Sequence, residues 1–272
     1  MSKSKTPQYD IGFVLFEGYE ILDLMGPLEV IGDVKTVVDE DSVPNLHLVA
    51  EDLELVGDHL GFQIKPTKTF EDCPPLDILV VPGGQVKNVL DPSKDAPASS
   101  HDPDHPCLQF IKNRVPQATY VMSICTGALL LAAAGALDGH LATTHWASMP
   151  ILNLFPEIMV TGGYPNYIIS RRVSNASAVA SSGEEGSEKK SGNLLTSSGV
   201  ISGVDAALAL IAIVYGNKVA KQVQLLIQYH PEPPFQSGNP AVADPAIVAE
   251  MCVALEDIIA NRYRIVKDLL RE

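Results

Sequence analysis

The residues Ser123-Ile124-Cys125-Thr126-Gly127 form the pattern in this chain that points most directly to chemistry. They stand where an apolar run, Tyr120–Ile124, passes into a helical stretch, Ala128–Ala134, with no room for a conventional loop. A cysteine in such a tight strand-to-helix elbow projects above the sheet edge, and a small residue two positions later allows the close turn. Backbone N–H groups at the start of the helix favour a thiolate. The pattern predicts a nucleophilic Cys125; the alternative is a small buried core residue, the common role of a free cysteine.

Two further features follow predicted core strands. Pro82-Gly83-Gly84 ends the run Asp77–Val81, and the carboxyl ends of parallel strands open onto the same edge of a sheet. We therefore expect the N–H groups of Gly84 and Thr126 to converge beside the cysteine sulfur as an oxyanion-type pocket; a simple turn is the alternative. Asp23 stands among leucines just after the first strand. A buried aspartate needs a partner, although a helix N-cap would also explain this one.

The elements that must position these residues alternate between strand and helix. Short apolar runs at Asp10–Phe16, Asp77–Val81 and Tyr120–Ile124 predict buried parallel strands, with helical stretches between them. The order predicts an α/β fold, a doubly wound and mostly parallel sheet sandwiched by helices. We expect this domain to cover residues 1–240, with a flexible low-complexity insertion at 175–193, and a C-terminal helical extension to cover residues 241–272.

Composition excludes several classes of protein. The 272 residues are 46% hydrophobic and carry a formal charge of −14, so a large core is available, and binding to nucleic acid or to an anionic membrane surface is disfavoured. The longest apolar stretches have roughly ten residues, short of the ~20 that cross a bilayer. The start of the sequence has no apolar signal-peptide region, and we expect a cytoplasmic protein. No CxxC pair suggests zinc or a disulfide framework, and the other cysteines are predicted to be structural: Cys73, Cys107 and Cys252.

The stretch from Ser123 to Trp146 (SICTGALLLAAAGALDGHLATTHW) resembles the ThiJ/PfpI superfamily, which has a flavodoxin-like sandwich of the class I glutamine amidotransferase type. The resemblance extends from Asp10 to about Pro240. Two segments look more like isocyanide (isonitrile) hydratases: Leu22–Pro27 (LDLMGP) and Tyr229–Pro240 (YHPEPPFQSGNP). The first of these and the central stretch also occur in AraC-type regulators. The insertion and the helix after Pro240 depart from the hydratase pattern.

The resemblance implies that Cys125 is the nucleophile, that Asp23 is its acid/base partner, and that Thr126 supports both. It also implies a supporting role for Asp205, and we expect His145 to line the pocket rather than to act as a base. The implied reaction adds water to an isocyanide, R–N≡C, to give an N-substituted formamide, with no metal or organic cofactor. The family is commonly dimeric, so a homodimer is implied.

Two other functions stay open at this point. One is glyoxalase-like or deglycase-like chemistry on 2-oxoaldehydes, although those branches often place a histidine where this chain has Thr126. The other is a non-enzymatic redox or ligand sensor that uses the same cysteine. A DNA-binding regulator is disfavoured, because only about thirty residues follow Pro240 and they contain no basic helix-turn-helix.

Overall fold

The computed structural model describes residues 7–91, 104–170 and 193–271. Its centre is a seven-stranded sheet in the order β10-β11-β7-β6-β1-β2-β5. Neighbouring strands are parallel except for the antiparallel pair β10 and β11 at one edge. The strands are β1 (Asp10–Val14), β2 (Asn45–Ala50), β5 (Lys68–Thr69), β6 (Ile78–Val81), β7 (Tyr120–Ile124), β10 (Tyr167–Ser170) and β11 (Asn193–Ser197).

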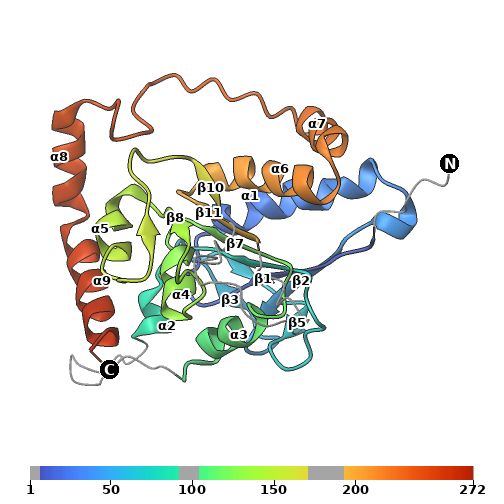
Figure 1. Cartoon of the computed structure of the whole chain (residues 1–272), viewed down its shortest axis with the longest axis horizontal. Helices are drawn as coiled ribbons and strands as arrows, with labels where there is room; N and C mark the ends of the chain where they lie inside the picture. Colours follow the sequence, from blue (N-terminus) through green and yellow to red (C-terminus); the bar gives the residue numbers. More distant parts are fainter. Residues whose placement is uncertain (1–6, 92–103, 171–192, 272) are drawn as a thin grey trace, which may run out of the picture.

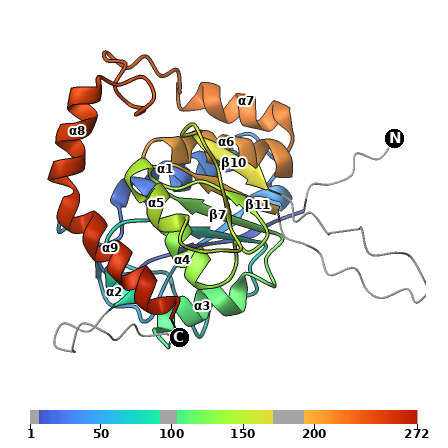
Figure 2. The same cartoon turned by 60° about the vertical axis from the view of Figure 1, so that its left-hand side comes forward.

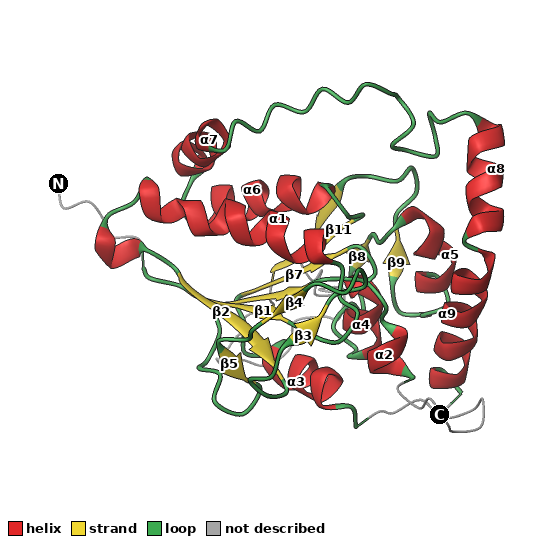
Figure 3. Cartoon of the chain, turned by 180° about the vertical axis from the view of Figure 1, so that it is seen from behind, coloured by secondary structure: helices red, strands yellow, loops and turns green. Residues whose placement is uncertain are grey.

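Helices cover both faces of this sheet (Figures 1 and 3). On one face lie α1 (Ile21–Gly32), α6 (Ser202–Val214) and α7 (Asn217–Leu226). On the other face lie α2 (Lys87–Leu90), α3 (Pro106–Arg114) and α4 (Gly127–Ala133). The central strands β1, β6 and β7 are apolar because both of their faces are covered, and Phe13, Leu79 and Met122 are completely buried. The predicted doubly wound α/β sandwich is confirmed.

Smaller elements complete the connections. Two separate pairs of short strands are formed by β3 (Val56–Gly57) with β4 (Gln63–Ile64) and by β8 (Leu141–Ala142) with β9 (Met159–Val160). The short helix α5 (Met149–Leu152) follows one of three 3₁₀ turns, η1 (Asp33–Thr36), η2 (Glu40–Ser42) and η3 (Trp146–Ser148). In the part of the chain that the structure describes, no helix has the length and apolar character needed to span a membrane.

The C-terminal extension consists of two helices, α8 (Pro245–Ala254) and α9 (Glu256–Leu269), where the sequence predicted one. They run down one side of the sandwich (Figures 1 and 2). None of the α8 residues is buried, whereas Ile265 and Val266 of α9 belong to the main hydrophobic core. The break at Leu255 separates a solvent-exposed helix from one that is anchored in the domain.

The predicted insertion at 175–193 lies outside the described residues except for Asn193, the first residue of β11. The strands on either side of it, β10 and β11, pair antiparallel as the two arms of the predicted hairpin.

Candidate active site

Cys125 occupies the predicted elbow between β7 and α4. Its φ of +54° lies in the left-handed region, which side-chain-bearing residues adopt at a cost of roughly 1–2 kcal/mol. Hydrogen bonds hold this conformation from both sides: the Cys125 N–H donates to the Ser197 carbonyl at 3.0 Å. The Thr144 hydroxyl donates to the Cys125 carbonyl at 2.8 Å. The backbone is therefore fixed in a strained form that turns the side chain out of the sheet.

Gly127 lets the helix start directly after the elbow. A Cβ atom at this position would lie 2.2 Å from the Val81 carbonyl oxygen and 2.8 Å from that of Pro82. The small residue that the sequence pattern required is thus explained by the close approach of α4 to the end of β6.

Replacing Gly127 with alanine is expected to destabilise the protein by about 1–3 kcal/mol, because the methyl group must displace backbone rather than a flexible side chain. Urea unfolding measures the change. Gly162→Ala is the matched control, since a Cβ there meets no atom within 4 Å. Equal stability of the two variants would contradict the packing described here.

Asp23, on α1, is completely buried beside the elbow. The Gly83 N–H donates to its Oδ2 at 2.9 Å, while Oδ1 has no hydrogen-bond partner among the described residues. Burial raises the pKa of Asp23 well above its usual value; the Gly83 N–H and the Cys125 thiol act in the opposite direction. Asp23 is therefore a carboxyl group that holds a proton more readily than usual, next to a thiol.

The Cys125 thiol is also harder to ionise than the sequence suggests. Burial raises its pKa well above the usual value and the Asp23 carboxylate raises it further, while the Thr126 N–H and Arg262 lower it. The helix N-terminus, which the sequence predicted to favour a thiolate, is outweighed, because the side chain is enclosed and an acid faces it. Since one negative charge disfavours the other, Cys125 and Asp23 titrate as a coupled pair.

The structure differs from the predicted oxyanion pocket at Gly84. The Gly84 N–H donates to the Thr126 hydroxyl oxygen at 3.0 Å, and the same hydroxyl donates to the Gly84 carbonyl oxygen at 3.2 Å. The Gly84 N–H is thus already engaged, whereas the Thr126 N–H lowers the pKa of the Cys125 thiol. Gly84 lines the cavity beside Cys125, as predicted. Its N–H binds the Thr126 hydroxyl, however, and not the space beside the sulfur.

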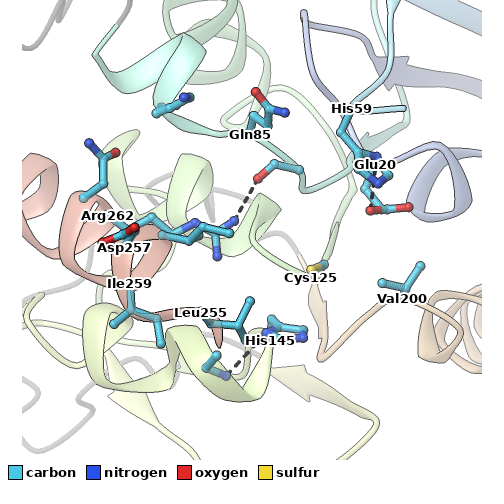
Figure 4. Close-up of a pocket in the computed structure, with 15 residues that line it drawn as sticks. Glu20, His59, Gln85, Cys125, His145, Val200, Leu255, Asp257, Ile259 and Arg262 are labelled. Atoms are coloured by element: carbon cyan, nitrogen blue, oxygen red, sulfur yellow. Dashed lines mark hydrogen bonds and ion pairs between the residues drawn. The ribbon is translucent and has the colours of Figure 1, made fainter. Parts of the chain in front are cut away.

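The Cys125 side chain opens into a cavity of about 530 Å³ (Figure 4). Its apolar lining includes Ala147, Val200, Leu255, Ile258 and Ile259. Leu255, Ile258 and Ile259 come from the C-terminal extension, as do the polar lining residues Asp257, Asn261 and Arg262. The extension is therefore a wall of the cavity that contains the candidate nucleophile.

Sequence reasoning missed the other polar residues of this cavity, which are Glu20, His59, Gln85 and Lys87. His59 Nδ1 lies 3.4 Å from Glu20 Oε2, and both side chains line the cavity (Figure 4). The position of Glu20, directly before α1 and close to Asp23, was a usable signal. His59 carried no local signal, because it lies between two very short strands.

The other predicted site residues have different locations. His145 lines the cavity as expected, and its Nδ1 accepts the Ala147 N–H at 3.4 Å. Asp205 is not among the cavity-lining residues. It accepts hydrogen bonds from Asn166 at 2.8 Å and Tyr229 at 2.9 Å, so it connects α6 to two loops. In the described ranges, no group of three His, Cys, Asp or Glu side chains is arranged to hold a metal ion.

Burial and the neighbouring Arg262 charge lower the pKa of His145 to about 4. Between pH 6.5 and pH 4 the unfolded chain binds a proton at His145 that the folded chain excludes, so acidification destabilises the fold in this window.

Relative to His145→Asn, the wild type is expected to lose about 1–2 kcal/mol more stability between pH 7 and pH 5. Urea unfolding of both proteins at both pH values tests this. Equal losses of unfolding free energy in the two proteins would contradict the lowered pKa of His145. Asp23 is unchanged in the variant, so its opposite contribution cancels in the comparison.

Comparisons with known proteins agree with this architecture. The chain is 39% identical over 240 residues to the isonitrile hydratase of Pseudomonas putida, a match that covers 88% of this chain and 87% of that protein. A ThiJ/PfpI family protein from Pseudomonas syringae has a similar structure, with a TM-score of 0.74 and 27% identity over 96% of this chain and 91% of that one.

An AraC family transcriptional regulator from Pseudomonas putida shares the fold alone, at a TM-score of 0.59 and 17% identity over 80% of this chain and 99% of that one. The model of the DJ-1/PfpI family matches residues 10–213, which include the whole sheet and the Cys125 elbow. The chain therefore belongs to the DJ-1/PfpI family.

Proposed function

We propose that this protein is an isocyanide hydratase that converts R–N≡C and water into an N-substituted formamide. The observation that carries the proposal is the placement of the Cys125 thiol next to the buried Asp23 carboxyl, with the thiol facing a cavity of largely apolar lining. The similarity to an isonitrile hydratase over 88% of the chain supports the same reaction. A cavity of about 530 Å³ is sufficient for a small organic isocyanide.

In the first step, the Cys125 sulfur attacks the terminal carbon of the isocyanide. The thiol proton passes to Asp23, and an S–C bond forms as negative charge develops on the isocyanide carbon. Asp23 then delivers the proton to that carbon, which gives the thioimidate R–N=CH–S–Cys125. The raised pKa of Asp23 suits this role, because the carboxyl must hold the proton before it releases it.

In the second step, water attacks the thioimidate carbon. The Asp23 carboxylate accepts one proton from the water and passes it to the imine nitrogen as the C–O bond forms, which gives the tetrahedral intermediate R–NH–CH(OH)–S–Cys125. The C–S bond then breaks, the hydroxyl proton of the intermediate passes through Asp23 to the sulfur as the C=O bond forms, and the N-substituted formamide leaves. The sum of the two steps is one isocyanide plus one water, without an oxidant or a reductant.

The direct test is to incubate the protein with a simple alkyl isocyanide and to measure the formamide by chromatography. Formamide from the wild type and none from Cys125→Ala is the expected result. A folded wild-type protein that forms no formamide would overturn the proposal. Lactate from methylglyoxal in a parallel assay would favour the glyoxalase-like alternative, and peroxide modification of Cys125 without turnover of either substrate would favour a sensor.

A homodimer and a cytoplasmic location remain predictions from the resemblance and the composition. Light scattering of the purified protein is expected to give twice the chain mass of 29.1 kDa. A mass of one chain would contradict the dimer.

A further inference from the structure

The C-terminal helix α9 brings the guanidinium of Arg262 into the cavity that contains Cys125 (Figure 4). One nitrogen, Nη2, donates to the Gly84 carbonyl at 3.1 Å, and the other, Nη1, donates to the buried Ser148 hydroxyl at 3.1 Å. These two contacts join α9 to the loop after β6 and to η3. Arg262 is therefore held in place by two separate segments of the chain.

The contact with Gly84 links Arg262 to the elbow itself. The Gly84 carbonyl accepts from the Thr126 hydroxyl as well as from Arg262, and the Gly84 N–H donates back to that same hydroxyl. Thr126 follows Cys125 in the chain, and its N–H lowers the pKa of the thiol. A single residue, Gly84, thus separates the guanidinium from the turn that presents the thiol.

The charge of Arg262 is not matched by a carboxylate. Among the described residues both of its hydrogen-bond partners are neutral oxygens, and it forms no ion pair. Glu20 faces His59, and Asp257 is exposed at the rim. Arg262 is half-buried, so part of its hydration is lost without an anion to replace it, and the position suits negative charge that arises during the reaction.

The electrostatics of the neighbouring groups agree with this placement. Burial lowers the pKa of His145 and raises that of Cys125; the Arg262 charge adds to the first shift and opposes the second, so it acts on two residues of the cavity. Burial lowers the pKa of Arg262 itself, and the Cys125 thiolate acts in the opposite direction.

We infer that Arg262 is a positioning residue of the active site, which the C-terminal extension adds to the Cys125–Asp23 pair. It fixes the Gly84–Thr126 contact and stabilises negative charge on the Cys125 sulfur. If the proposed hydratase function is correct, it also stabilises the anionic adduct that precedes protonation of carbon. Only this last part rests on the proposed function.

Alkylation of Cys125 tests the inference without any isocyanide. The rates with iodoacetate, an anion, and iodoacetamide, which is neutral, are compared in a Cys252→Ser background, because Cys252 is the exposed one of the other three cysteines. Loss of the Arg262 charge in Arg262→Met is expected to lower the iodoacetate-to-iodoacetamide rate ratio about 10-fold and to move alkylation to higher pH. Arg262→Lys is expected to retain most of the ratio.

The matched control is Arg264→Met on the same helix. Arg264 pairs with Asp91 and does not line this cavity, so the ratio is expected to stay within about twofold of the wild type. Arg262→Gln keeps hydrogen-bond donors without the charge and replaces the Met variant if that one fails to fold. An unchanged ratio in a folded, neutral variant would overturn the inference. A changed ratio in a protein that forms no formamide would overturn only the hydratase proposal.

Discussion

Replacing Cys125 with serine is expected to reduce kcat/KM for formamide production by about 10³-fold or more, because the alkoxide needed for attack is far less accessible than the thiolate. The left-handed backbone of residue 125 is held by Ser197 and Thr144 and does not depend on the sulfur. The fold is therefore expected to survive. Steady-state kinetics and circular dichroism measure the two effects separately.

The matched control for this variant is Cys107→Ser. Cys107 is a buried free cysteine on α3 that does not line the cavity beside Cys125. Its replacement is expected to affect stability and to leave kcat/KM within about twofold. A Cys125→Ser enzyme with activity close to the wild type would remove Cys125 from the mechanism, even if the protein is a hydratase.

Replacing Asp23 with asparagine is expected to reduce kcat/KM by about 10²–10⁴-fold, the usual contribution of a positioned acid or base. The amide oxygen still accepts the Gly83 N–H, so local structure is retained, but the side chain no longer carries a proton between sulfur, carbon and water. Because the Asp23 charge raises the pKa of Cys125, the same variant is expected to alkylate with iodoacetamide at lower pH than the wild type. If the thiol of this variant ionises more easily while its turnover is slower, the loss of activity reflects lost proton transfer and not a less reactive nucleophile.

Asp205→Asn is the comparison for that variant. Asp205 contacts Asn166 and Tyr229 and does not line the cavity, so its replacement is expected to lower stability more than kcat/KM. If Asp205→Asn reduced turnover as strongly as Asp23→Asn, the proton-transfer role would not be specific to Asp23.

The parts of this fold that were predictable from the sequence depend on local patterns. The apolar runs of β6 and β7 mark fully buried parallel strands, and the short step from Ile124 to Gly127 marks the elbow. An aspartate among leucines marked a buried acid, which the complete burial of Asp23 confirms. These signals each lie within a few residues of the group that they identify.

The parts that were not predictable depend on contacts between distant segments. Arg262 reaches the cavity only because Ile265 and Val266 anchor α9 in the core of the sandwich. The engagement of the Gly84 N–H by the Thr126 hydroxyl, and the location of Asp205, depend on how loops from separate strands meet. No spacing within one segment contains that information.

In the proposed reaction, Cys125 forms a covalent bond to the isocyanide carbon. Mixing the protein with an isocyanide, quenching with acid within milliseconds to seconds and measuring the intact mass tests this directly. We expect a mass increase of one isocyanide per chain that maps to the peptide containing Cys125 and is absent from Cys125→Ala. Formamide production with no adduct at any quench time, and undiminished in Cys125→Ala, would contradict it.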